Sequence, residues 1–236
     1  KVNAPQVLRQ ELGRHQWKRE PILIGTASDP YEPAEAEYLL TRRILQVLAE
    51  FESPAAISTK GVLVRRDVDV LRDLGRVAGV RVIFSVGSID DRVWKLTEPG
   101  APNPLSRLEA MQFLVENGIS AGVVMAPLLP GISDSSQSID AVAAAAASHR
   151  AQFLEANLLF LNPGSREGFM PSLEQAYPRL VPAYTRLYRK TYAPHAYEKS
   201  VLKIVAEARR KWGLPASSQW QTVQAPQRQL ELALSA

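Results

Sequence analysis

Short apolar runs alternate with longer stretches of helical periodicity along most of the chain. The apolar runs predict buried β-strands at 21–26, 55–59, 80–86, 121–126 and 158–161. Apolar positions spaced three and four residues apart predict helices near 4–13, 35–50, 67–77, 104–117, 136–148, 172–190 and 195–212. Alternation of this kind predicts an α/β fold with a parallel sheet and right-handed crossovers.

Local signals mark several of the helix ends. Asn103-Pro104 suits a helix start and Gly118 its stop, while Ser172 with Gln175 forms a capping-box pattern. The helix at 4–13 has no strand before it. Adding that strand to the five visible ones gives six β/α units, so we expect a partial (β/α)6 barrel of the TIM type. A flavodoxin-like open sheet is the structural alternative.

Composition places the chain among ordinary globular proteins. Of its 236 residues, 46% are hydrophobic and 22% are charged. It contains no cysteine, which excludes disulfides, a thiolate nucleophile and any cysteine-held metal site or iron–sulfur cluster within this sequence. No apolar run reaches the length of a membrane span. We expect a cytoplasmic protein with no membrane partner.

Three regions follow from these patterns. Residues 1–170 form the predicted core, 171–212 form basic helices packed on it, and 213–236 read as a mostly disordered tail. Residues 179–212 hold nine Lys or Arg and two acids, interleaved with Tyr184, Tyr188, Tyr192 and Tyr197. Such a block could bind nucleic acid, with phosphates on the cations and bases on the tyrosines. In the other interpretation the tyrosines form one packed helix face.

The carboxyl ends of the predicted strands supply candidate chemistry, because ligands of α/β folds bind there. Thr26, Ser28 and Asp29 follow the first strand, Lys60 follows the second, and Ser85 ends the third. Together they could hold a zwitterionic small molecule, with Lys60 on a carboxylate and Asp29 on an amine or ribose. Alternatively, Asp29 caps a turn before Pro30 and Lys60 is solvated.

Several enzyme classes lack their motifs here. The sequence contains no GxGxxG or GxxxxGK[ST] phosphate loop and no GxSxG. Its three histidines are scattered, which disfavours a metal site. An ordinary (β/α) enzyme that uses Asp29 or Lys60 as an acid–base group remains a further hypothesis.

Four ordered blocks carry a resemblance. They are GTASDPYEPAEAEYLLTRRILQVLAEF, ISTKGVLVRRDVDVL, VIFSVGSIDDRVWKLTEPGAPNPLSRLEAMQFLVENGI and AGVVMAPLLPGISD. This order resembles the spore photoproduct lyase-like branch of the radical S-adenosylmethionine (SAM) superfamily, over roughly residues 1–170. The resemblance implies a partial barrel, a [4Fe–4S] cluster held by a CxxxCxxC loop, and SAM. It also implies an enzyme that makes a 5′-deoxyadenosyl radical for hydrogen abstraction, and an electron donor such as flavodoxin or ferredoxin.

The resemblance also assigns roles to residues. Ser28 and Asp29 match a SAM-binding loop, Lys60 matches a lysine that reaches SAM, and Ser85 matches a serine that contacts it. Glu98 and Arg107 lie in a recurring segment that either lines the site or buttresses the next helix. Tyr31 either faces the cavity or packs on the neighbouring prolines.

One departure from the family pattern is large, because the sequence contains no CxxxCxxC loop. The absent loop, the absent first strand and the absent initiator Met are together explained if the chain is a fragment whose cluster ligands lie upstream of Lys1. In that case this chain alone is inactive in radical chemistry. The alternative is a cluster-free, non-enzymatic protein that binds SAM or a nucleotide or acts as a scaffold.

Overall fold

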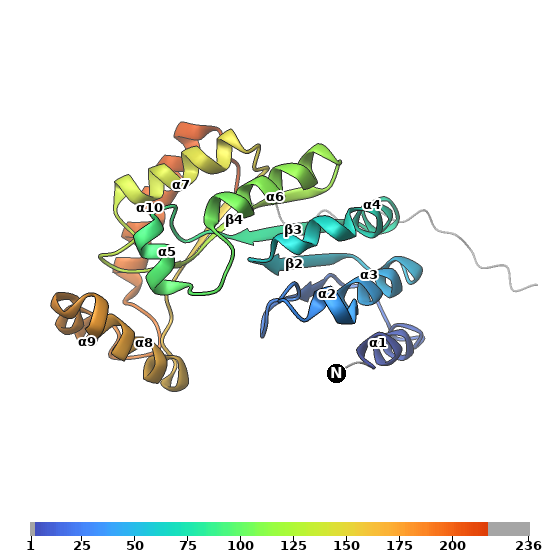
Figure 1. Cartoon of the computed structure of the whole chain (residues 1–236), viewed down its shortest axis with the longest axis horizontal. Helices are drawn as coiled ribbons and strands as arrows, with labels where there is room; N and C mark the ends of the chain where they lie inside the picture. The colour runs from blue at the N-terminus through green and yellow to red at the C-terminus, as the bar shows by residue number, and fades with distance from the viewer. Residues whose placement is uncertain (1–2, 217–236) are drawn as a thin grey trace, which may run out of the picture.

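Five parallel strands form one sheet at the centre of the molecule (Figure 1). The computed structural model describes residues 3–216. The strands are β1 (Ile22–Ile24), β2 (Ala55–Thr59), β3 (Val80–Ser85), β4 (Ser120–Leu128) and β5 (Leu154–Leu158). They lie in the order β1-β2-β3-β4-β5. The flavodoxin-like alternative is therefore wrong, because that fold has the order 2-1-3-4-5.

Helices lie before, between and after the strands, and those between successive strands form the crossovers. Before β4 they are α1 (Ala4–Leu12), α2 (Glu35–Tyr38), α3 (Leu40–Glu50), the 3₁₀ turn η1 (Val62–Asp67), α4 (Val68–Val77), α5 (Asp91–Thr97) and α6 (Pro104–Glu116). After β4 they are α7 (Ser136–Ser148), α8 (Pro163–Ala176), the 3₁₀ turn η2 (Pro178–Leu180), α9 (Val181–Leu187) and α10 (His195–Trp212). Among residues 3–216, no helix combines the length and the apolar character that crossing a membrane requires.

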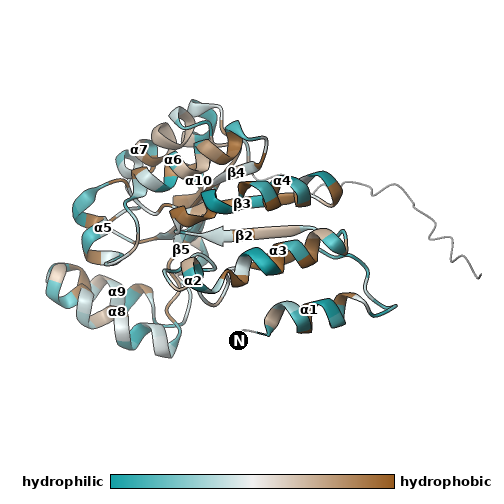
Figure 2. Cartoon of the chain, turned by 45° about the vertical axis from the view of Figure 1, so that its right-hand side comes forward, coloured by the Kyte–Doolittle hydropathy of each residue, from teal (hydrophilic) through white to brown (hydrophobic). Residues whose placement is uncertain are grey.

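The main core lies between the sheet and the helices that cover it. α3 and α4 pack together, α6 contacts β3 and β4, and α10 contacts α7 and β5. Hydrophobic residues gather on the inward sides of these helices, visible as brown bands on α3 and α4 in Figure 2. Fully buried members include Ile57, Val82, Phe84, Leu108 and Leu114. Burial of such side chains from both layers is the main source of stability for a parallel sheet.

A second, smaller core belongs to α8 and α9, which lie together beside the sheet end (Figures 1 and 2). Leu161, Leu173, Tyr184 and Tyr188 are its buried members. The Tyr184 ring packs on Phe169 at 5.5 Å and on Tyr188 at 5.7 Å, measured between centroids. These contacts fix α8 as one wall of the site described below.

An ion-pair network ties α2 and α3 to α4. Asp67 is fully buried and accepts hydrogen bonds from the guanidinium groups of Arg42 and Arg66. Arg66 also pairs with buried Glu35 at 3.0 Å, and Arg42 pairs with Asp69 at 2.6 Å. The Arg42 hydrogen bond lowers the pKa of Asp69 to about 2.

Some element predictions are wrong. The predicted helix at 35–50 is broken at Leu39, which adopts a left-handed conformation with φ 51°. The glutamate at position 35 caps the new helix, because its carboxylate accepts the N–H groups of Leu40 and Thr41. The prediction also missed α5 and the 3₁₀ turn η1. The helix predicted at 67–77 corresponds to α4, which begins at Val68 directly after η1.

The last strand and the helix after it are also misplaced in the prediction. The strand runs over 154–158 rather than 158–161, and the helix predicted at 172–190 is in fact α8, η2 and α9. Ser172 lies inside α8 and its hydroxyl donates to the Gly168 carbonyl, so the predicted capping box is absent. In the predicted tail, Leu214 is buried and the Pro215 carbonyl accepts a hydrogen bond from Leu154. The rest of the tail, 217–236, lies outside the described residues.

Candidate functional site

The predicted site residues lie where the strands end. Because the strands are parallel, the loops after β1, β2, β3 and β4 meet at one edge of the sheet. Thr26, Ser28 and Asp29 follow β1, Lys60 follows β2, and Ser85 is the last residue of β3. Their roles in binding stay predictions, but their neighbours are now defined.

Asp29 acts as a clamp between the β1 loop and β2. One carboxylate oxygen accepts hydrogen bonds from the Tyr31 N–H at 2.9 Å and the Thr59 hydroxyl at 2.6 Å. The other oxygen accepts from the Lys60 N–H at 2.6 Å. Within the chain, Asp29 therefore caps the turn at Pro30 and Tyr31. It also fixes the backbone from which the Lys60 side chain extends.

Lys60 belongs to a chain of charged groups. Its ammonium pairs with one carboxylate oxygen of Glu98 at 2.9 Å. The other oxygen of Glu98 accepts from the guanidinium of Arg107 at 2.5 Å. The Lys60 side chain is 36% exposed and that of Arg107 is completely buried. Lys60 is thus reachable by a ligand, while its present partner is held from inside the protein.

Arg107 anchors this chain to β3. Its guanidinium also donates to the backbone carbonyls of Ser85 at 2.8 Å and Pro102 at 2.8 Å. The Ser85 hydroxyl donates to the Ala126 carbonyl at 2.7 Å. Glu98 lines a cavity and also pairs with Arg107 of α6. Arg107 lines neither cavity described here, and its contacts join α6 to β3.

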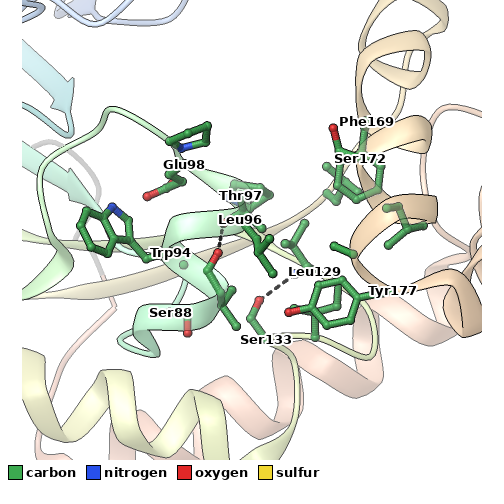
Figure 3. A pocket seen from close by; sticks show the side chains of 18 of the residues that line it. Ser88, Trp94, Leu96, Thr97, Glu98, Leu129, Ser133, Phe169, Ser172 and Tyr177 are labelled. Carbon is green, nitrogen blue, oxygen red and sulfur yellow. Dashed lines mark hydrogen bonds between the residues drawn. The ribbon is translucent and has the colours of Figure 1, made fainter.

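One cavity, named the Lys60 cavity here, has a volume of about 430 Å³ and lies at the carboxyl ends of β2, β3, β4 and β5 (Figure 3). Lys60 and Glu98 line it at the strand side. Its remaining wall comes from the α5 region, the loop after β4, and α8. The side chains labelled in Figure 3 are Ser88, Trp94, Leu96, Thr97, Glu98, Leu129, Ser133, Phe169, Ser172 and Tyr177. This size and mostly apolar lining suit a small-molecule site.

Thr26, Ser28 and Asp29 line a second cavity, beside β1 and α2, of about 450 Å³. The structure therefore places Lys60 and Glu98 at one cavity and Thr26, Ser28 and Asp29 at another, and Ser85 lines neither. Tyr31 lines neither of them. It is 4% exposed and packs in the main core, and burial raises the pKa of its hydroxyl above the usual range.

The α8 wall was missed by sequence reasoning, and a signal for it existed. Asn162 caps α8 by accepting the Ser165 N–H at 2.8 Å, and Pro163 is the first helical residue. The same Asn-Pro signal correctly predicted the start of α6. Extending α8 back to Pro163 would have placed Phe169 on a helix beside the strand ends.

The tyrosines of the basic block do not support base stacking as a group. Tyr184 and Tyr188 are buried in the second core, and the Tyr197 hydroxyl donates to Asp134 at 2.5 Å. Tyr192 is 71% exposed. The packed-face interpretation therefore describes Tyr184 and Tyr188.

The chain offers no ligands for an iron–sulfur cluster, because all 236 residues lack a thiol. Among residues 3–216, no cluster of three or more acidic or histidine side chains could hold a metal ion. A cluster therefore does not fit the residues of this chain. A zwitterionic organic cofactor does fit the strand ends, where Lys60 offers an accessible ammonium.

The chain is similar in sequence to proteins of several organisms. An uncharacterized protein of Mycobacterium tuberculosis is 34% identical over 215 residues, which are 91% of this chain and 63% of that protein. An uncharacterized protein of Methanocaldococcus jannaschii is 27% identical over 211 residues, which are 89% of this chain and 73% of that protein. The chain thus spans about 63% of the length of its mycobacterial relatives.

Solved structures share the fold. A spore photoproduct lyase mutant with bound AdoMet and dinucleoside spore photoproduct superposes with a TM-score of 0.67 at 17% identity, over 89% of this chain and 63% of that one. The predicted partial barrel is thereby confirmed. The sequence pattern of the Radical SAM superfamily matches residues 4–141, more than half of the chain. The chain therefore belongs to the radical SAM superfamily.

Proposed function

We propose that this chain is the barrel core of a radical SAM enzyme and that it binds SAM at the strand ends around Lys60. In this family, SAM and a [4Fe–4S] cluster supply a 5′-deoxyadenosyl radical for hydrogen abstraction. The cluster thiolates must then come from outside these 236 residues, and the electron from a donor such as flavodoxin or ferredoxin. One observation carries the proposal: an accessible ammonium stands at the mouth of a cavity on the sheet edge that family ligands use.

The residues of the chain divide the work of binding. Lys60 provides the positive charge for the SAM carboxylate, and Asp29 holds the Lys60 backbone in place. Glu98 pairs with the ammonium and orients it before the ligand arrives, and Arg107 keeps Glu98 in place. Ser28 and Ser85 are proposed as further hydrogen-bonding groups, Ser85 after its hydroxyl turns away from Ala126.

Isothermal titration of the chain with SAM tests the binding step. We expect binding that weakens by about tenfold or more in Lys60→Met, because a hydrogen bond to a charged group is lost. Lys95→Met is the matched control, since Lys95 is an exposed residue of α5 that lines neither cavity. Absence of SAM binding, or equal affinity in Lys60→Met, would overturn the proposal.

The enzymatic step is tested on the protein as its native source makes it. We expect protein purified without oxygen to contain iron and sulfide and to convert SAM to 5′-deoxyadenosine when reduced. Native protein that binds SAM but contains no iron would favour the cluster-free binding protein instead. For a nucleic-acid partner, the remaining support is the positive charge of residues 179–212. Absent or salt-insensitive binding of DNA would therefore exclude that partner.

A further inference from the structure

The Lys60 cavity combines one ion pair with a mostly apolar surface. Twenty residues line it, and Lys60 and Glu98 are the charged ones. These two pair with each other at 2.9 Å, and Glu98 is further neutralised by Arg107. A molecule that enters beyond this ion pair meets no unpaired charge among the lining residues. Burying a ligand charge there would be costly, so the cavity favours an uncharged group.

Aromatic rings lie on opposite sides of the cavity. Figure 3 shows Trp94 on the α5 side, with Phe169 and Tyr177 across from it on the α8 side. Leu96, Leu129, Ile132, Leu159 and Leu173 fill the surface between them. Aromatic side chains on two walls of a hollow of this kind offer contact area to a flat ligand.

The aromatic walls are fixed before any ligand binds. The Trp94 indole donates to the Ala101 carbonyl at 3.1 Å. Phe169 is backed by Tyr184, which packs on Tyr188, whose hydroxyl donates to the Leu159 carbonyl at 2.8 Å. Side chains held in this way lose little conformational freedom on binding, which favours affinity.

We infer that this cavity binds an uncharged, flat ring group of the substrate, held between the α5 and α8 walls next to Lys60. The inference deepens the proposed function and rests on it, because the bound ring belongs to a substrate only if the chain is part of an enzyme. Ser88 is the polar group best placed for orientation, since its hydroxyl accepts the Asp90 N–H at 3.1 Å and its proton is available for a ligand oxygen.

Titration with two naphthalene probes tests the charge preference. In Lys60→Met, where no ammonium can receive a carboxylate, we expect neutral 2-naphthol to bind at least about tenfold more tightly than anionic 2-naphthoate, because the carboxylate would lie among apolar side chains without a counter-charge. The titrations contain no SAM, so their outcome does not depend on SAM binding. Equal or tighter binding of 2-naphthoate, or no binding of 2-naphthol, would overturn the inference.

A cavity-filling variant locates the binding. Gly168 lines the cavity from α8, and a Cβ placed there meets no atom within 4 Å. Gly168→Phe therefore causes no clash at its Cβ and adds a ring at the cavity lining, and we expect it to weaken 2-naphthol binding by about tenfold or more. Gly164→Phe is the matched control on the same helix, away from the cavity lining, and we expect affinity within about twofold of the parent.

Further measurements keep the two proposals separable. Thermal melts of both glycine variants show whether each is folded, and Gly168→Ala provides a milder filling variant. Unchanged 2-naphthol binding in folded Gly168→Phe would place the probe elsewhere and overturn the inference. SAM titration of Gly168→Phe then shows whether the variant has blocked only the ring pocket, in which case SAM binding is kept, or has also lost the SAM site. If the chain binds 2-naphthol but not SAM, the proposed function and the substrate role are both overturned. The cavity would then still be a binding pocket for flat rings.

Discussion

Gly25, at the exit of β1, shows how one position holds the loops of the site together. Its φ is +99°, and a Cβ built on it would lie 2.1 Å from the Ser58 carbonyl oxygen. Glycine is required there both by the backbone conformation and by the approach of β2. The β1 loop can reach the end of β2 only because this residue has no side chain.

Gly25→Ala should therefore lower the free energy of unfolding by about 3 kcal/mol, because strain and a backbone clash add. Gly100→Ala separates the two causes, since Gly100 has φ +86° but nothing within 4 Å of its Cβ. We expect it to cost about 1 kcal/mol. Urea unfolding of both variants is the measurement, and equal losses would contradict the role of the Ser58 contact.

Asp69 provides a test through pH. Its pKa is lowered to about 2 from 3.8 by Arg42, so the pairing stabilises the fold at pH above 3.8 and is lost as the pH falls through 2. We expect part of the loss of stability between pH 4 and 2 to vanish in Asp69→Asn. Its pair with Arg42 is half exposed, so the effect is small and screened by salt. Identical acid unfolding curves for parent and variant would rule it out.

At the scale of elements, Arg107 joins β3, α6 and the segment that follows α5. It donates to Ser85, Pro102 and Glu98 from a completely buried position. Removal leaves a carboxylate and two carbonyls short of a partner, so Arg107→Met should lower the free energy of unfolding by about 3 kcal/mol. Arg76→Met removes an exposed ion pair with Asp73 and should leave stability almost unchanged. Similar melting temperatures for both variants would show that the buried network is not needed.

Elements with two local end signals could be predicted from the sequence. The Asn103 cap and the stop before Gly118 gave α6 nearly to the residue, and α7 and α10 matched their predicted ranges. By contrast, β5 alternates apolar residues with Glu155 and Asn157, and so lacks the continuous apolar run of a strand buried on both faces. In α8, Pro171 lies inside the helix, whereas the sequence predicts a helix that begins after it, at 172. A helix that packs on a second core can hold a proline that local rules exclude.

The site residues also fall into those that the sequence could predict and those that depend on the tertiary fold. Lys60 and Asp29 could be proposed from the sequence because strand ends in a parallel sheet converge whatever the side chains are. The pairing of Lys60 with Glu98, 38 positions later, depends on how α5 folds back over the strands. The Asn162-Pro163 signal could have given the start of α8, but its place opposite Lys60, which lies 103 positions before Pro163, depends on the tertiary fold.

At the scale of the whole molecule, the lack of thiols separates binding from radical chemistry. We expect the chain incubated without oxygen with iron and sulfide to form no [4Fe–4S] cluster, because no thiolate is available to hold one. The check is the visible absorption of a cluster together with iron content after gel filtration. A stable cluster on this chain would mean that other side chains hold it, and the external source of ligands would then be wrong.

The hydrogen bond from the Lys60 N–H to Asp29 has a consequence for the speed of ligand capture. Since the Lys60 backbone is already fixed, its ammonium can leave Glu98 for an incoming carboxylate by turning about side-chain bonds. Exposed side-chain rotations take picoseconds to nanoseconds, whereas loop closure takes far longer. The Lys60 amide should therefore exchange its hydrogen slowly with D₂O, both with and without ligand. At this strand end, therefore, the backbone is rigid while the Lys60 ammonium reorients quickly.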